Sequence, residues 1–303
     1  MPAAPTRSVE LTWCVVSIIK ITNKYITYIQ LSSHRPSSVL PQIEDYASTA
    51  NSKICIVTAG ARGSEDKKDV IVRQNTEIFR QIVPQLVSHS PNCILLVCSY
   101  PVDEMSFVAW KLSKLPPQRV IGSGTILESA RFRCLIAQKL DVHPDSCQAF
   151  VIGEQGCNSI PVWSSVSVAG VRLRDVNPDL GTGVDPEDWQ SIHKEVMESA
   201  KEVTCLKECG SWGMALSVAR IVRAVLFDSK ECFAISTHIK GCRHGVEKDV
   251  FLSLPCIVGC AGVQFIVRQH LSDDEKDCMQ KSADRMYETQ KTLGLDNETK
   301  VEC

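Results

Sequence analysis

Residues Lys53 to Arg62 read K-I-C-I-V-T-A-G-A-R, and they indicate the architecture of the N-terminal half. Ile54 to Ala59 is an unbroken apolar run, which is typical of a strand buried on both faces of a parallel sheet. Gly60 ends the run and is the first glycine of the chain. A phosphate-cradling loop needs glycines for its tight turn, so no such loop is expected before this point.

Outward from this strand, apolar runs and amphipathic stretches alternate. Helices are predicted over 70–88, 105–115 and 129–140, and strands over 93–99 and 119–121. Pro84 is expected to interrupt the first helix, because proline lacks a backbone N–H and clashes with the preceding turn. This alternation is typical of an α/β layer with parallel pairing.

After Gln148 the pattern becomes that of an α+β unit. Its predicted elements are a strand over 166–173, a helix from Asp185 to Leu206, a helix over 211–227, strands over 234–240 and 250–258, and a terminal helix over 273–293. Asp185 suits the N-cap of its helix, and the proline that follows suits the first helical position.

Residues 1–50 differ from the rest because prolines punctuate them and serine is frequent. A β-branched and aromatic run over 15–31 is expected to form one or two strands. The apolar stretch 11–19 is too short to span a bilayer, and no small-residue cleavage site follows it. No membrane partner is therefore expected.

The composition of the 303 residues is that of an ordinary globular protein, with 44% hydrophobic and 22% charged residues. A net charge of −2 does not favour nucleic acid as a partner. The 15 cysteines are odd in number and irregularly spaced, which argues against a disulfide framework and for a reducing, cytoplasmic compartment. Their spacing also predicts no metal site.

A second decisive stretch is V-I-G-E-Q-G-C-N-S-I-P-V-W-S, Val151 to Ser164. An apolar strand end runs into a turn bracketed by Gly153 and Gly156, which is a common way to hold a reactive side chain over a pocket. Gln155 stands at the apex of this turn. A neutral amide orients a hydroxyl by hydrogen bonding but cannot accept its proton.

From about Pro41 to Leu293 the chain resembles the vertebrate-type L-lactate dehydrogenases of the lactate/malate dehydrogenase family. The matching segments include A-N-S-K-I-C-I-V-T-A-G-A-R (50–62), V-A-W-K-L-S (108–113), R-V-I-G-S-G (119–124), S-A-R-F-R (129–133), N-P-D-L-G-T (177–182) and D-V-F-L-S-L-P-C-I-V-G (249–259). The resemblance implies an NAD-binding half, a half that carries substrate residues, a 2-hydroxy or 2-oxo acid substrate, and an oligomer.

The fold expected on this basis is α/β, an incomplete doubly wound (Rossmann-type) parallel sheet followed by an α+β substrate and oligomerisation domain. We divide the chain into an atypical segment (1–40), a remnant of the NAD-binding domain (41–147), the C-terminal domain (148–295) and a tail (296–303). The family's first strand and its G-x-G-x-x-G loop have no counterpart in residues 1–40. Unless residues 10–50 cover the open sheet edge, poor solubility is expected.

The resemblance also assigns roles to single positions. The cofactor contacts that survive are Thr58, Ala59, Gly60 and Arg62. The substrate positions are Arg131, which would pair with a carboxylate, Lys68 where the family has a loop arginine, Tyr100 where it has an asparagine, and Gly210 where it has a threonine. The catalytic histidine and its aspartate correspond to Gln155 and Glu128.

Three hypotheses follow. The first is a lactate dehydrogenase-like protein that is catalytically impaired or inactive, because the residue that would take the hydroxyl proton is an amide. The second is an active NAD-dependent 2-hydroxy acid oxidoreductase with another substrate, in which Glu128 and Arg131 act through a water. The third is a non-enzymatic module that binds or regulates lactate dehydrogenase subunits as a homo- or hetero-oligomer.

Overall fold

The computed structural model describes residues 15–21, 26–32, 46–61, 68–207, 210–242 and 246–295. Arg62, one of the expected cofactor contacts, lies outside these ranges. The tail over 296–303 and much of the first 45 residues lie outside them as well.

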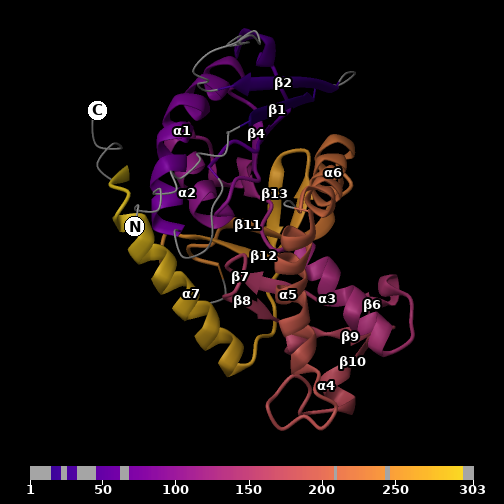
Figure 1. The fold of residues 1–303 in the computed structure, drawn as a ribbon. Helices are drawn as coiled ribbons and strands as arrows, with labels where there is room; N and C mark the ends of the chain where they lie inside the picture. The colour runs from indigo at the N-terminus through magenta and orange to yellow at the C-terminus, as the bar shows by residue number, and fades with distance from the viewer. Residues whose placement is uncertain are drawn as a thin grey trace, which may run out of the picture.

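Three parallel strands form the centre of the N-terminal half: β3 (Ile54–Val57), β4 (Ile94–Val97) and β5 (Val120–Gly122). Every residue of these strands is buried, as their unbroken apolar runs predict. The helices α1 (Lys68–His89) and α2 (Val102–Ser113) cover them and pack against each other (Figure 1). The predicted α/β layer is confirmed.

A β-hairpin completes the N-terminal side of this sheet. β1 (Val15–Ile21) and β2 (Ile26–Ser32) are antiparallel, and β1 also runs antiparallel to β3, with Ile18 opposite Val57. In a doubly wound sheet the strands beside β3 would run parallel to it. The hairpin therefore covers the β3 edge by another topology, and two strands form where one or two were predicted.

Antiparallel strands of the C-terminal half continue the same sheet. They are β7 (Val151–Gly153), β8 (Ser159–Pro161), β11 (Glu231–His238), β12 (Phe251–Gly259) and β13 (Gly262–Ile266). β11 joins β5 where Ser236 lies opposite Gly122, and the result is one 10-stranded sheet in the order β2-β1-β3-β4-β5-β11-β12-β7-β8, with β13 beside β12. Only glycine fits at position 122, because a Cβ there would overlap the side chains of Ser106 and Ser236.

Four longer helices flank the C-terminal strands: α3 (Ile126–Lys139), α5 (Gln190–Lys207), α6 (Ser211–Phe227) and α7 (Asp273–Lys291). In the view of Figure 1, α7 lies on one side of the strands, and α3, α5 and α6 lie on the other. No helix among the described residues is long and apolar enough to cross a membrane.

A small sheet lies at the lower right of Figure 1, near the short helix α4 (Leu173–Val176). Its strands are β6 (Cys147–Gln148), β9 (Ser167–Val168) and β10 (Val171–Arg172). The single strand predicted over 166–173 is thus two strands, because Ala169 and Gly170 have positive φ angles of 49° and 87° and turn the chain. Short 3-10 helices cover Tyr46–Thr49, Pro117–Arg119, Pro144–Ser146 and Trp163–Ser165.

The prediction that Pro84 interrupts the first helix is wrong, because α1 continues through it. The neighbouring Ile82, Val83 and Leu86 are buried in the core. Burying three aliphatic side chains contributes more free energy than the roughly 3 kcal/mol that an internal proline costs. Tertiary packing therefore keeps this turn helical.

The start predicted for the helix from Asp185 to Leu206 is also wrong, because α5 begins at Gln190 instead of Asp185. The Asp185 carboxylate accepts hydrogen bonds from the backbone N–H groups of Gly181 and Glu187, both at 3.1 Å. These bonds close a turn before the helix, so Asp185 acts as a turn residue.

Candidate functional site

The turn that displays Gln155 joins β7 to β8. Gly153 and Gly156 have φ angles of 84° and 102°, a region that disfavours residues with a Cβ, so both glycines are required by the backbone. β7 is fully buried, and Gly153 pairs with Ser253 of β12. A rigid sheet thus fixes the position of the turn.

Gln155 is held from two sides. Its backbone N–H donates to Oδ2 of Asp103 at 2.8 Å, and its side-chain amide donates to the carboxylate of Glu128 on α3. Burial raises the pKa of Glu128, and this hydrogen bond and the charge of Arg131 oppose the rise. The structure therefore brings together the two residues that the sequence predicts as the catalytic pair.

Arg131 lies one helical turn after Glu128 on α3 and is half-buried. Its guanidinium makes no hydrogen bond or ion pair with another described residue, and it influences Glu128 by charge alone. An arginine with unused donors beside a polar turn suits a carboxylate, which it binds with two parallel hydrogen bonds.

Lys68 is the first residue of α1, and its ammonium enters a network of charges. Nζ lies 2.6 Å from Oε1 of Glu104 and 3.7 Å from Oε2 of Glu154. Glu154 also accepts two hydrogen bonds from Arg285 of α7, at 2.9 and 3.1 Å. Burial alone would lower the pKa of Lys68, but the carboxylates of Glu104, Glu154 and Asp103 raise it. The lysine therefore stays charged.

Asp103 precedes Glu104 in the first turn of α2 and is 3% exposed. Burial and the charge of Glu104 raise its pKa to about 7, against the nearby Ser236 hydroxyl and the hydrogen bond from the Gln155 N–H. One carboxylate oxygen each of Asp103, Glu104 and Glu128 has no hydrogen-bond partner among the described residues. The centre beside Gln155 is therefore rich in buried, incompletely paired carboxylates.

The carboxyl end of β3 holds the expected cofactor contacts that the structure describes. Thr58 is exposed, Ala59 is buried and Gly60 is half-buried, directly after β3. The buried side chain of Asn75 ties the ends of β3 and β4 together, since its amide donates to the Tyr100 carbonyl at 2.7 Å and accepts from the Ala61 N–H at 2.6 Å. Ligands of open parallel sheets bind at this end of the strands.

The residues present fit only part of a dinucleotide. A pyrophosphate is normally held by a glycine-rich turn and the N-terminus of the helix that follows the first strand. Here β1 leads into β2 of an antiparallel hairpin, and Gly60 is the first glycine of the chain. The positions from Thr58 to Gly60 are in place, but the described residues offer no helix that could hold the pyrophosphate.

Gly210, the last of the expected substrate positions, precedes α6 and is exposed. A Cβ placed there would have no described atom within 4 Å. The structure therefore does not pack position 210 against Gln155 or Arg131, and a larger side chain would fit at this position.

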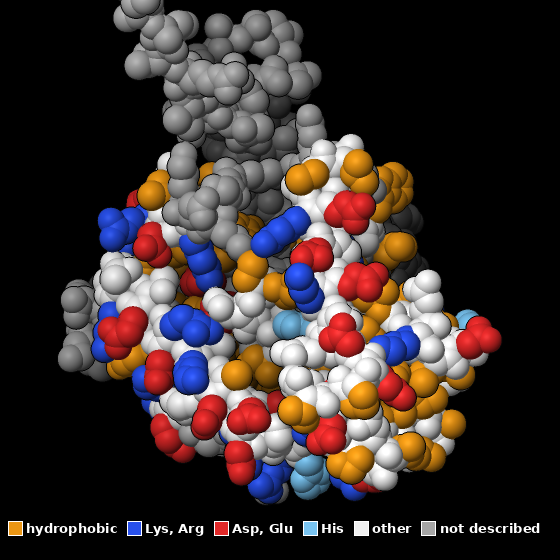
Figure 2. Space-filling model, turned by 60° about the horizontal axis from the view of Figure 1, so that its bottom comes forward, with side chains coloured by type: hydrophobic (Ala, Val, Ile, Leu, Met, Phe, Trp, Pro, Cys, Tyr) orange, Lys and Arg blue, Asp and Glu red, His pale blue; other side chains and the backbone are white. Residues whose placement is uncertain are grey.

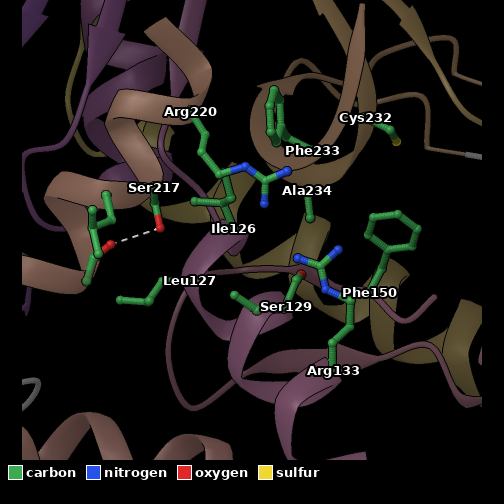
Figure 3. A pocket seen from close by; sticks show the side chains of 13 residues that line it. Ile126, Leu127, Ser129, Arg133, Phe150, Ser217, Arg220, Cys232, Phe233 and Ala234 are labelled. Carbon is green, nitrogen blue, oxygen red and sulfur yellow. Dashed lines mark hydrogen bonds between the residues drawn. The ribbon is translucent and has the colours of Figure 1, made fainter. Parts of the chain in front are cut away.

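Two cavities lie outside this centre. One of about 230 Å³ lies between α3, α6 and β11, where Arg133 and Arg220 point toward each other among apolar side chains (Figure 3). The other, of about 550 Å³, lies between β8, α5 and α7 and is bordered by His193 and Arg285. Figure 2 shows the face of the molecule at the bottom of Figure 1, where acidic and basic side chains surround a hollow. None of the predicted site residues lines either cavity.

Sequence reasoning missed Asp103, Glu104, Glu154, Arg285 and the bracing Asn75. Asp103 and Glu104 open a helix, where acidic side chains are expected simply because they suit the positive end of the helix dipole. Arg285 follows Glu154 by 131 residues. The available signal was two adjacent acids at the end of a buried strand, where a ligand site is common.

Comparisons with known proteins cover most of the chain. Residues 27–122 match the family model described as lactate/malate dehydrogenase, NAD binding domain. Residues 125–293 match the model described as lactate/malate dehydrogenase, alpha/beta C-terminal domain. The boundary between the two models falls just after β5, where the parallel strands end.

Several curated relatives are similar over the same region. The L-lactate dehydrogenase A chains of Cyprinus carpio and Danio rerio are 50% and 51% identical over 253 residues, which is 83% of this chain and 76% of each relative. The L-lactate dehydrogenase of Petromyzon marinus is 50% identical over 251 residues, 82% of this chain and 75% of the relative. The resemblance seen in the sequence is confirmed.

Proposed function

The chain belongs to the lactate/malate dehydrogenase family, and we propose that it is a lactate dehydrogenase-like protein that is catalytically impaired. The family reaction is the NAD-dependent interconversion of L-lactate and pyruvate. The observation that carries the proposal is the amide of Gln155, held by Asp103 and Glu128 at the apex of the β7–β8 turn. Loss of a general base at such a position costs on the order of 10²–10⁴-fold in rate.

The nucleotide side of the site supports the same proposal. NAD is the cofactor of the family's N-terminal domain, but the β1–β2 hairpin stands where a glycine loop and helix would hold its pyrophosphate. Thr58, Ala59 and Gly60 would still contact a bound nucleotide. We expect weak NAD binding, since contacts along β3 alone lack the helix end that favours a phosphate.

The second candidate is an active 2-hydroxy acid oxidoreductase with another substrate. In this candidate Glu128 acts as the base through a water, and Arg131 binds the carboxylate. The buried position of Glu128 and its raised pKa favour it, because a carboxyl tuned upward is a better base near neutral pH. Against it, the Gln155 amide already occupies one oxygen of the Glu128 carboxylate.

The third candidate, a subunit-binding module, rests on exposed apolar side chains. Trp212, Leu216 and Phe227 of α6 are each at least 70% exposed in the single chain. Patches of this kind are common at subunit contacts.

We propose a cytoplasmic protein that associates with itself or with lactate dehydrogenase subunits. We propose that its domains are divided at residues 40, 147 and 295. Size-exclusion chromatography with light scattering, alone and with a Danio rerio subunit, tests the proposed association.

The decisive experiment uses the purified full chain beside the Danio rerio L-lactate dehydrogenase A chain. A fluorescence titration measures NADH affinity, and the loss of NADH absorbance measures turnover with pyruvate. We expect weaker binding and a turnover at least 100-fold below the relative. Turnover within a few-fold of the relative would overturn the proposal. Tight NADH binding and turnover with another 2-oxo acid alone would favour the second candidate.

A further inference from the structure

Glu104 places a buried negative charge beside the turn that displays Gln155. It is 2% exposed, and its neighbour Asp103 bonds the Gln155 backbone directly. Oε1 of Glu104 lies 2.6 Å from the ammonium of Lys68, and Oε2 has no partner among the described residues. The ammonium of Lys68 therefore already has a buried counter-ion within the chain.

We propose that Glu104 determines the charge specificity of the site, because it binds Lys68 as an internal counter-ion and thereby excludes small carboxylate-bearing 2-oxo acids. The inference rests on the proposed function in one respect, that this centre is the substrate site of the family. The residue that excludes the acids is then Glu104 of α2, which belongs neither to the β7–β8 turn nor to the expected cofactor contacts after β3.

The charges around Lys68 support this assignment. Four buried carboxyl groups, those of Asp103, Glu104, Glu128 and Glu154, lie near the cations Lys68, Arg131 and Arg285. Lys68 and Arg285 are already paired. Of these three cations, Arg131 alone makes no hydrogen bond or ion pair with another described residue, so an entering anion would meet one unpaired cation and several carboxyl groups.

The distance between the Glu104 carboxylate and a bound anion decides how strongly Glu104 weakens anion binding. A like charge about 5 Å away in a partly buried site weakens anion binding by on the order of 10²-fold at an effective dielectric constant near 20. The same carboxylate also removes the attraction that Lys68 would supply. A neutral ligand of the same shape feels neither effect, so the proposal predicts discrimination by charge and not by size.

A purely structural role is the competing explanation. A buried ion pair contributes little to stability, because desolvation of both charges offsets their attraction. Glu104 also leaves one oxygen without a partner, which a pair serving stability alone would not favour. The two explanations differ in what happens to an added anion when the charge of Glu104 is removed.

The test measures binding of pyruvate and of its neutral methyl ester to the full chain by saturation-transfer NMR on the methyl signals. Glu104→Gln keeps the shape of the side chain and is expected to raise pyruvate affinity at least 10-fold while methyl pyruvate changes less than 2-fold. The double variant Glu104→Gln/Lys68→Met must lose that gain. Glu77→Gln, which removes an exposed carboxylate of α1 paired with Arg80, is the matched control and should change neither ligand.

Unchanged pyruvate binding in a folded Glu104→Gln variant, or an equal gain for both ligands, would overturn the proposal. A second measurement needs no variant and no activity. Lys68 should react with acetic anhydride far more slowly than the exposed Lys201 of α5, because Glu104 raises its pKa. Equal labelling in the wild-type chain would refute the pairing even if the proposed function itself failed in the turnover assay.

Discussion

The hairpin edge of the sheet and the β7–β8 turn differ in opposite ways from what the family resemblance implies. At the hairpin edge, β1 runs antiparallel to β3, so the topology itself has changed. At the turn, the backbone has its two positive-φ glycines, and the change that the resemblance implies is confined to the side chain of Gln155. A changed side chain can be restored by one substitution, whereas a changed topology cannot.

The largest expected effect concerns Asp103, which anchors the turn. Its pKa is raised from 3.8 to about 7, so the folded chain keeps this proton in a pH range where the unfolded chain has lost it. The stability that the neutral carboxyl contributes is present below pH 3.8 and is lost as the pH rises through 7. Asp103→Asn should therefore gain up to roughly 4 kcal/mol over the wild type between pH 4 and pH 8.

Thermal melts of both proteins across this pH range measure the effect of Asp103. The asparagine keeps an oxygen that accepts from the Gln155 N–H, so the comparison isolates the charge. If the melting temperatures of the two proteins differ by the same amount at every pH, the raised pKa of Asp103 is contradicted.

The next effect tests the hairpin edge. Ile19→Pro removes a backbone donor from β1, which lies between β2 and β3 and pairs with both. Since a proline inside a central strand removes a ladder hydrogen bond, we expect the free energy of unfolding to fall by about 3 kcal/mol. Chemical denaturation gives the value.

Hydrogen exchange at the β3 amides provides the control for Ile19→Pro. Protection of β3 should fall while protection of β12, far from the hairpin in the strand order, persists. No change at β3 would show that the sheet does not depend on the hairpin.

A smaller effect is expected at the ion pair between α7 and the turn. Arg285→Met removes both hydrogen bonds to Glu154 while keeping the aliphatic length of the side chain. Arg285 is 49% exposed, so water replaces part of the lost interaction, and the expected loss is about 1 kcal/mol. Arg268→Met, a change at an arginine with no ion pair to another described residue, is the control. A fall of more than about 3 kcal/mol in the free energy of unfolding would show that water does not replace the lost interaction, as expected for a fully buried ion pair.

The sequence predicted the helices and strands better than it predicted the contacts between them. α6 has the predicted bounds, and β3, β4 and β5 lie where apolar runs place them, because burial on both faces leaves a local pattern. β13 carries no such pattern and was not predicted.

The parts of the candidate site divide in the same way. Gln155 and Glu128 were found because each stands in a recognisable motif. Lys68 was expected in a loop, but it begins a helix and pairs with Glu104, 36 residues later in the chain. A contact between distant residues depends on how helices pack, and neither the register of β1 on β3 nor the approach of α7 to the turn has a local signature.

The smallest effect is expected where a single substitution introduces the residue that the family resemblance implies at position 155. Gln155→His supplies a group that titrates near neutral pH, and the rigid turn would place it against Glu128. We nevertheless expect turnover with pyruvate to rise less than 10-fold, because Lys68 remains bound to Glu104 and the hairpin still occupies the pyrophosphate side. Steady-state assays of Gln155→His and of Gln155→His/Glu104→Gln measure the two contributions. A 100-fold gain from the single substitution would mean that the turn alone limits catalysis, and that the altered topology beside β3 is compatible with cofactor binding.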